Sequence, residues 1–290
     1  MAVDGIVVVD KPAGWTSHDV VGKVRRLART RRVGHAGTLD PMATGVLVLG
    51  IERATRLLGH LALTEKAYHA TIRLGVTTHT DDAEGTVVAR VPAGHVTNDQ
   101  IMTAIADLTG EILQVPSSVS AIKVAGERAY RRVQSGERVD IPPRPVTVRR
   151  FELEDARRSG DVVDLDVVVE CSSGTYIRAL ARDLGEALGV GGHLTALRRT
   201  RVGPYGLEQA RPLDQLERDF AVLPIADVAA RTFPRYDVDD STARLVSFGQ
   251  KLPGVHVGSG PVGIFAPDGT FLALYEDAAD GAKPVAVFAG

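Results

Sequence analysis

The sequence predicts an α+β protein built on a mixed, largely antiparallel sheet flanked by helices and loops. Alternating, strand-like segments are joined by short turns typical of hairpins, and helix-like segments are scattered among them in no regular order. The composition is a third observation, because 290 residues with 44% hydrophobic and 24% charged side chains can bury a full core. We expect one large domain followed by a small one.

The N-terminal elements follow from apolar spacing and capping residues. The apolar run at 6–9 predicts a buried strand, and Thr16 or Ser17 can cap the next helix, in which apolar residues recur at helical spacing. Residues 45–51 predict a strand and residues 52–62 a helix.

The next segments read as two strands and a helix. Residues 66–76 alternate between apolar and polar positions, which predicts a strand. The polar cluster THTDDAEG at 78–85 predicts a turn, and a strand follows at 86–91. Thr97 with Gln100 forms a capping box for the following helix.

Two longer strands are predicted at 146–154 and 162–171, joined by the turn RRSGD. Ser173 can cap a helix over 175–188, and residues 193–203 return as a strand.

The composition changes near residue 232, which predicts two domains, 1–231 and 232–290. Short alternating strands broken by Gly, Pro and Asp-Gly turns make the second domain β-rich. Its GSGPVG at 258–263 has dinucleotide-binding spacing, but a Rossmann fingerprint needs a helix where this sequence predicts a strand.

The net charge of −2 hides a strong segregation of charge along the chain. Residues 11–35 carry +6 and residues 123–150 carry +5, whereas residues 205–290 carry −5. A polyanion is therefore expected at the first two regions. The alternative is that each basic run is only a solvated helix face.

Several classes of protein do not fit the sequence. The single cysteine, Cys171, excludes an internal disulfide framework and is expected to be a buried thiol. No apolar run is long enough to span a membrane, and the N-terminus does not resemble a signal peptide, so we expect a cytoplasmic protein. The histidines have no metal-ligand spacing, so neither a metal nor a cofactor is expected.

Asp40 is the candidate catalytic residue. The following Pro41 pushes its backbone toward extended angles, and Gly34, Gly37 and Gly45 allow sharp bends around it, so that the carboxylate is aimed. By pattern alone, a lone aspartate in such a turn is more often a cap or a turn-former.

The segment GHAGTLDPMATG at 34–45 closely resembles the active-site motif of the TruB family of tRNA pseudouridine synthases. Four further segments resemble other motifs of this family in the same order. They are DKPAGWTS at 10–17, KAY at 66–68, SSGTYIR at 172–178 and HLTALRRT at 193–200. The resemblance extends over about residues 5–205.

This resemblance implies a pseudouridine synthase fold and isomerisation of one uridine, at position 55 in the T-loop of tRNA, to pseudouridine. The bond from base N1 to ribose C1′ breaks, the base turns, and C5 bonds to C1′, without a cofactor. It also implies that residues 117–145 form a mobile RNA-binding thumb and that 232–290 form a small PUA-like RNA-binding domain. The negative charge of the latter predicts weak contact with RNA.

The resemblance also implies roles for individual residues. Asp40 is the catalytic carboxylate, Arg178 keeps it charged and directed, and Tyr68 stacks on the target base. The remaining candidates are expected to bind the substrate: His35 where the flipped nucleotide leaves the loop, Tyr176 beside Arg178, Leu197 as an apolar wall, and the basic residues Lys11, Arg31 and Arg32 on the RNA.

Other interpretations stay open at this point. Tyr68 and Leu197 also suit an ordinary core, and the alternative for His35 is a role as a metal ligand or a general base. The carboxylate could attack C1′, add to C6 of the base or act through a glycal. The chain departs from the family before and within the thumb, at 115–121 and 130–136. A noncatalytic tRNA-folding chaperone would need only the basic groove and the base-extruding residues, and in either case a monomer is expected.

Overall fold

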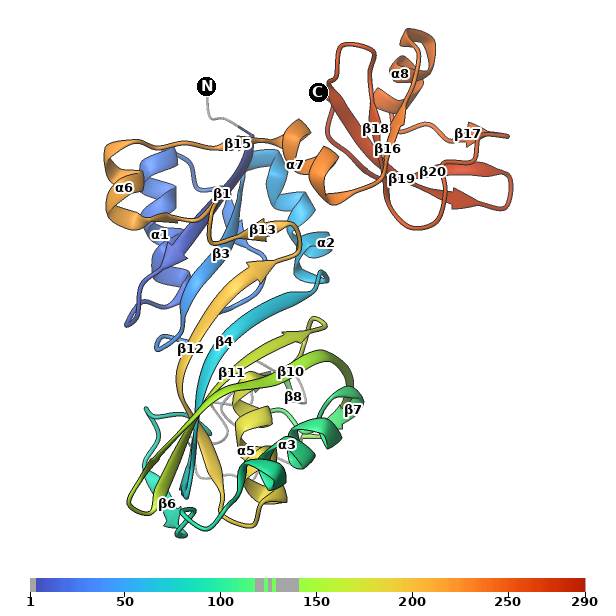
Figure 1. Cartoon of the computed structure of the whole chain (residues 1–290). Coiled ribbons are helices and arrows are strands. Elements are labelled where there is room, and N and C mark those ends of the chain that lie inside the picture. Colours follow the sequence, from blue (N-terminus) through green and yellow to red (C-terminus); the bar gives the residue numbers. More distant parts are fainter. Residues whose placement is uncertain (1–3, 118–122, 125–126, 129–140, 290) are drawn as a thin grey trace.

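The computed structural model describes residues 4–117, 123–124, 127–128 and 141–289 (Figure 1). Its main feature is an 11-stranded mixed sheet in which β4 (Lys66–Leu74) and β12 (Gly192–Val202) run from one lobe of the molecule into the other. The strand order along the main path is β14-β1-β3-β12-β4-β11-β10-β7, with β2, β13 and β15 paired at its sides. Most pairings are antiparallel, and β1–β14 and β3–β12 are parallel. The predicted α+β class is confirmed.

The other strands of this sheet have the following bounds: β1 Gly5–Lys11, β2 Val33–His35, β3 Thr44–Ile51, β7 Gly110–Gln114, β10 Arg144–Ser159, β11 Val162–Cys171, β13 Tyr205–Gly206, β14 Arg211–Pro212 and β15 Leu223–Pro224. Two short hairpins lie outside it, formed by β5 (Val76–Thr78) with β6 (Val87–Arg90) and by β8 (Lys123–Val124) with β9 (Glu127–Arg128). Most of the segment 117–145, which is expected to form the thumb, lies outside the described residues, as does 130–136 within it.

Two predicted helix caps are confirmed. Thr16 caps α1 (Ser17–Ala28) in a capping box with Asp19, and Thr97 caps α3 (Asn98–Asp107) in one with Gln100.

Two helix predictions need correction. Residues 52–62 form a 3₁₀ helix, η1 (Glu52–Leu57), followed by the short α2 (Leu58–Ala62), and the Thr55 hydroxyl donates to the Glu52 carbonyl, an acceptor that a regular helix would use. The helix predicted from residue 175 is α5 (Ile177–Ala187), whose N-cap is Tyr176 rather than Ser173. The Thr175 hydroxyl instead donates to the Ser172 carbonyl (3.0 Å) and forms a turn, so the helix begins two residues later than predicted.

The main apolar core lies between the sheet and the helices α1, α3 and α5. The side chains of β4 that alternate inward, Tyr68, Ala70, Ile72 and Leu74, belong to it as predicted. No helix in the described part of the chain is long and apolar enough to cross a membrane.

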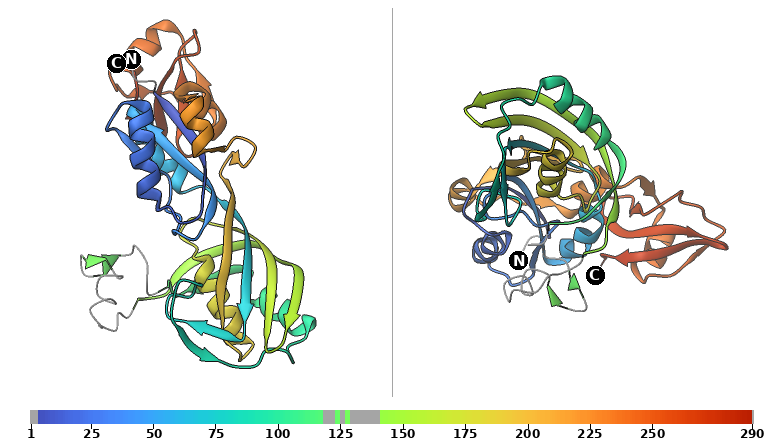
Figure 2. Two further views of the ribbon diagram at one scale, coloured as in Figure 1. Left: turned by 90° about the vertical axis from the view of Figure 1, so that its left-hand side faces the viewer. Right: turned by 90° about the horizontal axis from the view of Figure 1, so that it is seen from below.

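The C-terminal part folds around a five-stranded sheet of order β16-β18-β19-β20-β17. Its strands are β16 Arg235–Asp237, β17 Leu252–Pro253, β18 Val262–Phe265, β19 Phe271–Ala278 and β20 Gly281–Val287, and the remaining helices are α6 Leu213–Arg218, α7 Ile225–Thr232 and α8 Asp240–Ser247. The N-terminal lobe carries α1, α2, β1 and β3, and the second lobe carries α3, α5, β7, β10 and β11 (Figure 1). Figure 2 shows the C-terminal domain, the N-terminal lobe and the second lobe in this order along an elongated molecule.

The C-terminal domain packs directly against the N-terminal lobe. Phe265, Phe271 and Phe288 share an apolar cluster with residues of β1, β3 and α2. Arg53 also donates to the Phe288 carbonyl (2.5 Å) and Arg56 to the Val287 carbonyl (2.6 Å). The small domain is therefore anchored on the lobe that carries the Asp40 loop.

Candidate active site

The loop between β2 and β3 carries Asp40, and backbone contacts hold it from several sides. Gly37 (φ 101°) and Gly45 (φ 99°) lie on either side of it in conformations that other residues rarely adopt. The Ser17 hydroxyl accepts from the Leu39 N–H (2.8 Å) and donates to its carbonyl (3.0 Å), so that α1 fixes the residue before Asp40. The carboxylate is thus presented by a rigid loop.

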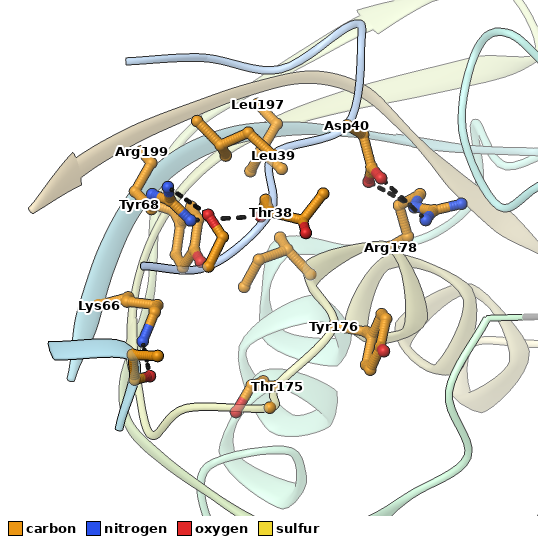
Figure 3. Close-up of a pocket in the computed structure, with 14 residues that line it drawn as sticks. Thr38, Leu39, Asp40, Lys66, Tyr68, Thr175, Tyr176, Arg178, Leu197 and Arg199 are labelled. Carbon is orange, nitrogen blue, oxygen red and sulfur yellow. Dashed lines mark hydrogen bonds and ion pairs between the residues drawn. The ribbon is translucent and has the colours of Figure 1, made fainter. Parts of the chain in front are cut away.

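Arg178, in the first turn of α5, forms a bidentate ion pair with Asp40 (Figure 3). Its Nε lies 3.0 Å from Asp40 Oδ2 and its Nη2 lies 3.3 Å from Oδ1. The arginine side chain is 6% exposed and the aspartate 35% exposed. A planar guanidinium in this arrangement fixes both the charge and the direction of the carboxylate, while Asp40 keeps an open side toward the cavity.

Asp82, which the sequence analysis treated only as part of a turn, is the second partner of Arg178. Its Oδ2 lies 3.3 Å from Arg178 Nη1, and the same nitrogen donates to the Thr80 carbonyl (3.0 Å). The Asp82 side chain is only 5% exposed. Arg178 is therefore held between two carboxylates, one at the cavity and one behind it.

A cavity of about 260 Å³ opens beside Asp40. Five of the predicted residues line it together: Asp40, Tyr68, Tyr176, Arg178 and Leu197. They come from four separate segments, namely the Asp40 loop, β4, β12 and the start of α5 (Figure 3). The structure thus brings residues from distant parts of the sequence together around one cavity.

Two aromatic side chains give the cavity its walls. Tyr68 is buried, and this burial raises the pKa of its hydroxyl. The backbone of Tyr176 is held by Gln114, whose amide donates to the Tyr176 carbonyl (3.1 Å) and accepts from its N–H (2.8 Å). An aromatic surface with fixed orientation suits a flat, unpaired base.

Two buried cationic side chains that were not predicted as site residues, Lys66 and Arg199, also line the cavity. Arg199 donates to the carbonyls of Val46 (2.7 Å) and Gly37 (3.1 Å), and Lys66 donates to those of Ala62 (2.8 Å) and Thr64 (2.7 Å). Burial, with a contribution from the charge of Arg199, lowers the pKa of Lys66 to about 8.

Lys11 lies elsewhere than the RNA groove in which we expected it. Its side chain is fully buried, and its ammonium donates to the carbonyls of Pro12 (2.9 Å), Trp15 (2.6 Å) and Pro41 (3.1 Å). Burial lowers its pKa to about 8. Its position fits a support beneath the Asp40 loop and not a contact with a phosphate.

His35, Arg31 and Arg32 lie outside the cavity lining. His35 is half-buried, its Nδ1 has no hydrogen-bond partner among the described residues, and burial together with the charge of Arg199 lowers its pKa. Arg31 and Arg32 are exposed, and Arg32 lies 3.7 Å from Glu52. The two arginines are therefore open to a partner at the surface.

No group of three or more histidine, cysteine or acidic side chains in the described ranges could hold a metal ion. The chemistry that the site itself offers is that of one directed carboxylate beside an aromatic cavity with nearby cations.

Family models match three successive parts of the chain. They describe the TruB family pseudouridylate synthase N-terminal domain (residues 25–177), the tRNA pseudouridylate synthase B C-terminal domain (178–224) and a tRNA pseudouridine synthase II C-terminal domain (233–289).

Curated relatives are similar over nearly the whole chain. The tRNA pseudouridine synthase B of Streptomyces griseus is 60% identical over 99% of this chain and 97% of its own, and that of Thermobifida fusca is 60% identical over 99% of both. Among solved structures, a Cbf5-Nop10-Gar1 complex contains a chain with a TM-score of 0.72 and 28% identity, covering 99% of this chain and 84% of that one. A chain of an H/ACA RNP bound to a substrate RNA has a TM-score of 0.71 and 26% identity, covering 99% and 85%.

Proposed function

Because this chain belongs to the TruB family of tRNA pseudouridine synthases, which isomerise uridine to pseudouridine in tRNA, we propose that its target is uridine 55 in the T stem-loop. The observation that carries the proposal is the directed Asp40–Arg178 pair at a cavity walled by Tyr68 and Tyr176. A uridine stacked in a loop must be extruded to reach such a cavity, as in other enzymes that act on a base. The chaperone alternative is not favoured, since it would not require this pair.

Asp40 is the catalytic carboxylate in this proposal. The N1–C1′ bond breaks, the base turns within the cavity, C5 bonds to C1′, and the C5 proton leaves while N1 gains one. The reaction is redox-neutral. The ion pair with Arg178 aims Asp40 at the sugar, and Tyr68 stacks on the base while it rotates. The apolar side of Leu197 completes the wall against which the base turns.

The RNA backbone binds, in this proposal, where basic residues gather. Arg31 and Arg32 are exposed at the end of the basic segment 11–35, and residues 117–145 supply a second basic segment. His35 lies between the Asp40 loop and these arginines in sequence and occupies the gap left by the extruded nucleotide. The C-terminal domain, within a region of charge −5, adds a weaker contact. The enzyme acts as a cytoplasmic monomer.

The test is release of tritium from a T stem-loop RNA carrying 5-tritiated uridine at position 55. We expect release from this RNA and none when cytidine replaces that uridine and the label is placed on the other loop uridines. Release from the second RNA would contradict the assignment to position 55.

Asp40→Asn tests the catalytic assignment in the same assay, because it removes the charge and leaves the shape. We expect no turnover and RNA binding close to that of the wild type. Asp164→Asn is the matched control, since Asp164 forms a bidentate pair with Arg73 (2.7 Å for both contacts) away from the cavity. Near-normal turnover by Asp40→Asn would overturn the proposed role.

A further inference from the structure

Helix α5 carries a second arginine, Arg182, one helical turn after Arg178. The turn between β5 and β6 presents two adjacent acids to these two arginines. Asp82 pairs with Arg178, and Asp81 Oδ2 lies 3.3 Å from Arg182 Nη1. The side chains of Asp81 and Arg182 are 11% and 18% exposed, so water screens the outer pair only in part. The turn is thus attached to one face of α5 at two points.

The backbone of this turn is held on its other side by β12. The Leu194 N–H donates to the Asp81 carbonyl (3.0 Å), and the Ala83 N–H donates to the Leu194 carbonyl (2.9 Å). Asp81 itself has φ 60°, a conformation that costs a non-glycine residue free energy and persists when its surroundings impose it. The contact with Arg182 is a side-chain interaction that can hold Asp81 in this conformation.

Arg182 also reaches the strand that leads toward the second basic segment. Its Nη2 donates to the Val115 carbonyl (2.7 Å), directly after Gln114, whose amide holds Tyr176. Asp183 orients the guanidinium by accepting from Nε (2.9 Å) and Nη2 (2.7 Å). One side chain therefore connects α5, the Asp81–Asp82 turn and the end of β7.

Arg182 is not among the residues that line the cavity, and among the described contacts none joins it to Asp40. Its geometry gives it a different use. The hydrogen bonds to Leu194 hold the backbone of the turn, and the ion pair between Asp82 and Arg178 is one side-chain contact between the turn and α5. The pair between Asp81 and Arg182, one helical turn away, is a second such contact, and together they fix where Asp82 stands behind Arg178.

We propose that Arg182 and Asp81 form a positioning pair that sets the Arg178 guanidinium, and through it the direction of Asp40, for isomerisation. This inference rests on the proposed function of the Asp40 site. It predicts that loss of the pair slows the chemical step while RNA binding is retained, because the cavity and the exposed basic residues are untouched.

The experiment uses Asp81→Asn, Arg182→Gln and the variant that combines both. The control is Arg73→Gln, which removes an arginine–aspartate pair on the opposite face of the sheet from Tyr68. Single-turnover tritium release at saturating T stem-loop gives the rate, and filter binding gives the dissociation constant. We expect each single variant to be roughly 10-fold slower, since small misplacements of a catalytic group have large effects on rate. The double variant should be no slower than the slower single, because both remove the same interaction.

Arg182→Lys retains the charge but not the forked geometry that reaches both Asp81 and Val115, so we expect it to restore the rate only in part. A merely structural role would instead lower the melting temperature of Asp81→Asn and Arg182→Gln without slowing the single-turnover rate. Wild-type rates in Arg182→Gln, or additive losses in the double variant, would overturn the proposal.

A second measurement does not depend on the substrate. In protein labelled with ¹⁵N-arginine, the Nε–H signal of Arg178 is assigned by its loss in Arg178→Lys. We expect this signal to shift in Asp81→Asn and Arg182→Gln and to stay in place in Arg73→Gln, because Arg178 Nε donates to Asp40 (3.0 Å). An unmoved signal would overturn the positioning role. Absence of tritium release from the wild type would instead overturn the proposed function.

Discussion

Replacing Asp82 by asparagine tests whether Arg178, in its proposed role, needs its second carboxylate partner. Asparagine keeps the shape of the side chain and an oxygen that can accept from the Glu84 N–H (3.1 Å) and the Thr80 hydroxyl. The position 3.3 Å from Arg178 Nη1 then carries an amide N–H₂ instead of a carboxylate oxygen. Two donors face each other, and the buried guanidinium keeps Asp40 as its one described carboxylate partner.

The size of the effect follows from burial. Both side chains are about 5% exposed, so the lost interaction is a desolvated, charge-assisted contact worth about 1.5–3 kcal/mol. A shift of the Arg178 guanidinium toward the Thr80 carbonyl, or a tighter contact with Asp40, alters the direction of Asp40. At about 1.4 kcal/mol per factor of ten, we expect kcat to fall by about 10- to 100-fold.

The assay is single-turnover tritium release with the T stem-loop RNA, together with urea unfolding to measure stability. We expect the loss to be in kcat, with the dissociation constant for RNA close to that of the wild type. Asp164→Asn breaks a pair of the same kind that is partly exposed, so it should change stability by less than about 1 kcal/mol and leave turnover unchanged. Equal turnover in Asp82→Asn and Asp164→Asn would refute the reasoning.

Two further predictions concern the support of the Asp40 loop. Gly45 has φ 99°, and a methyl group on it would lie 2.2 Å from the Arg199 carbonyl oxygen, so Gly45→Ala should lower the free energy of unfolding by at least about 2 kcal/mol. Gly59→Ala is the control, because its methyl group would meet nothing within 4 Å, and it should not lower this free energy. Urea unfolding compares the two variants. Burial lowers the pKa of Lys11 from its ordinary value of 10.5, which applies to the unfolded chain, to about 8 in the folded protein. Between these two pH values the unfolded chain binds more protons than the folded protein, so the free energy of unfolding rises with pH. The stability of the wild type relative to Lys11→Met should therefore increase between pH 8 and 10, by at most about 3 kcal/mol, and a difference independent of pH would contradict the burial of the charge.

Periodicity predicted β4 well because one face of this strand is buried in the core. The alternation in 66–76 places Tyr68 and Ile72 on the core side of β4, as a period of two requires. The helix starting at residue 175 was placed two residues too early, since Ser173 has the composition of a cap but lies in a turn closed by Thr175. Local composition does not distinguish these two uses of a hydroxyl.

The site was predicted in part. The motif around Asp40 and the residue Arg178 were found by resemblance, and the structure brings them within 3.0 Å. Asp82 was missed, because nothing in the turn 78–85 shows that one of its acids is buried against a helix about 100 residues later. The arginines of α5 at helical spacing were the signal that could have paired the two adjacent acids with a single helix face.

The buried cations of the cavity connect stability with substrate binding. Lys66 and Arg199 satisfy their N–H groups with backbone carbonyls, and within the described ranges neither lies at ion-pair distance from a carboxylate. Carbonyl oxygens satisfy hydrogen bonds but carry no net charge, so they compensate the desolvation of the Lys66 ammonium only in part. Burial, together with the charge of Arg199, lowers the pKa of Lys66 to about 8. An RNA phosphate near the cavity would supply the missing charge and raise that pKa. The same feature that destabilises the free protein therefore favours binding of a polyanion, and carboxylates added beside Lys66 to stabilise the fold would weaken the affinity for RNA.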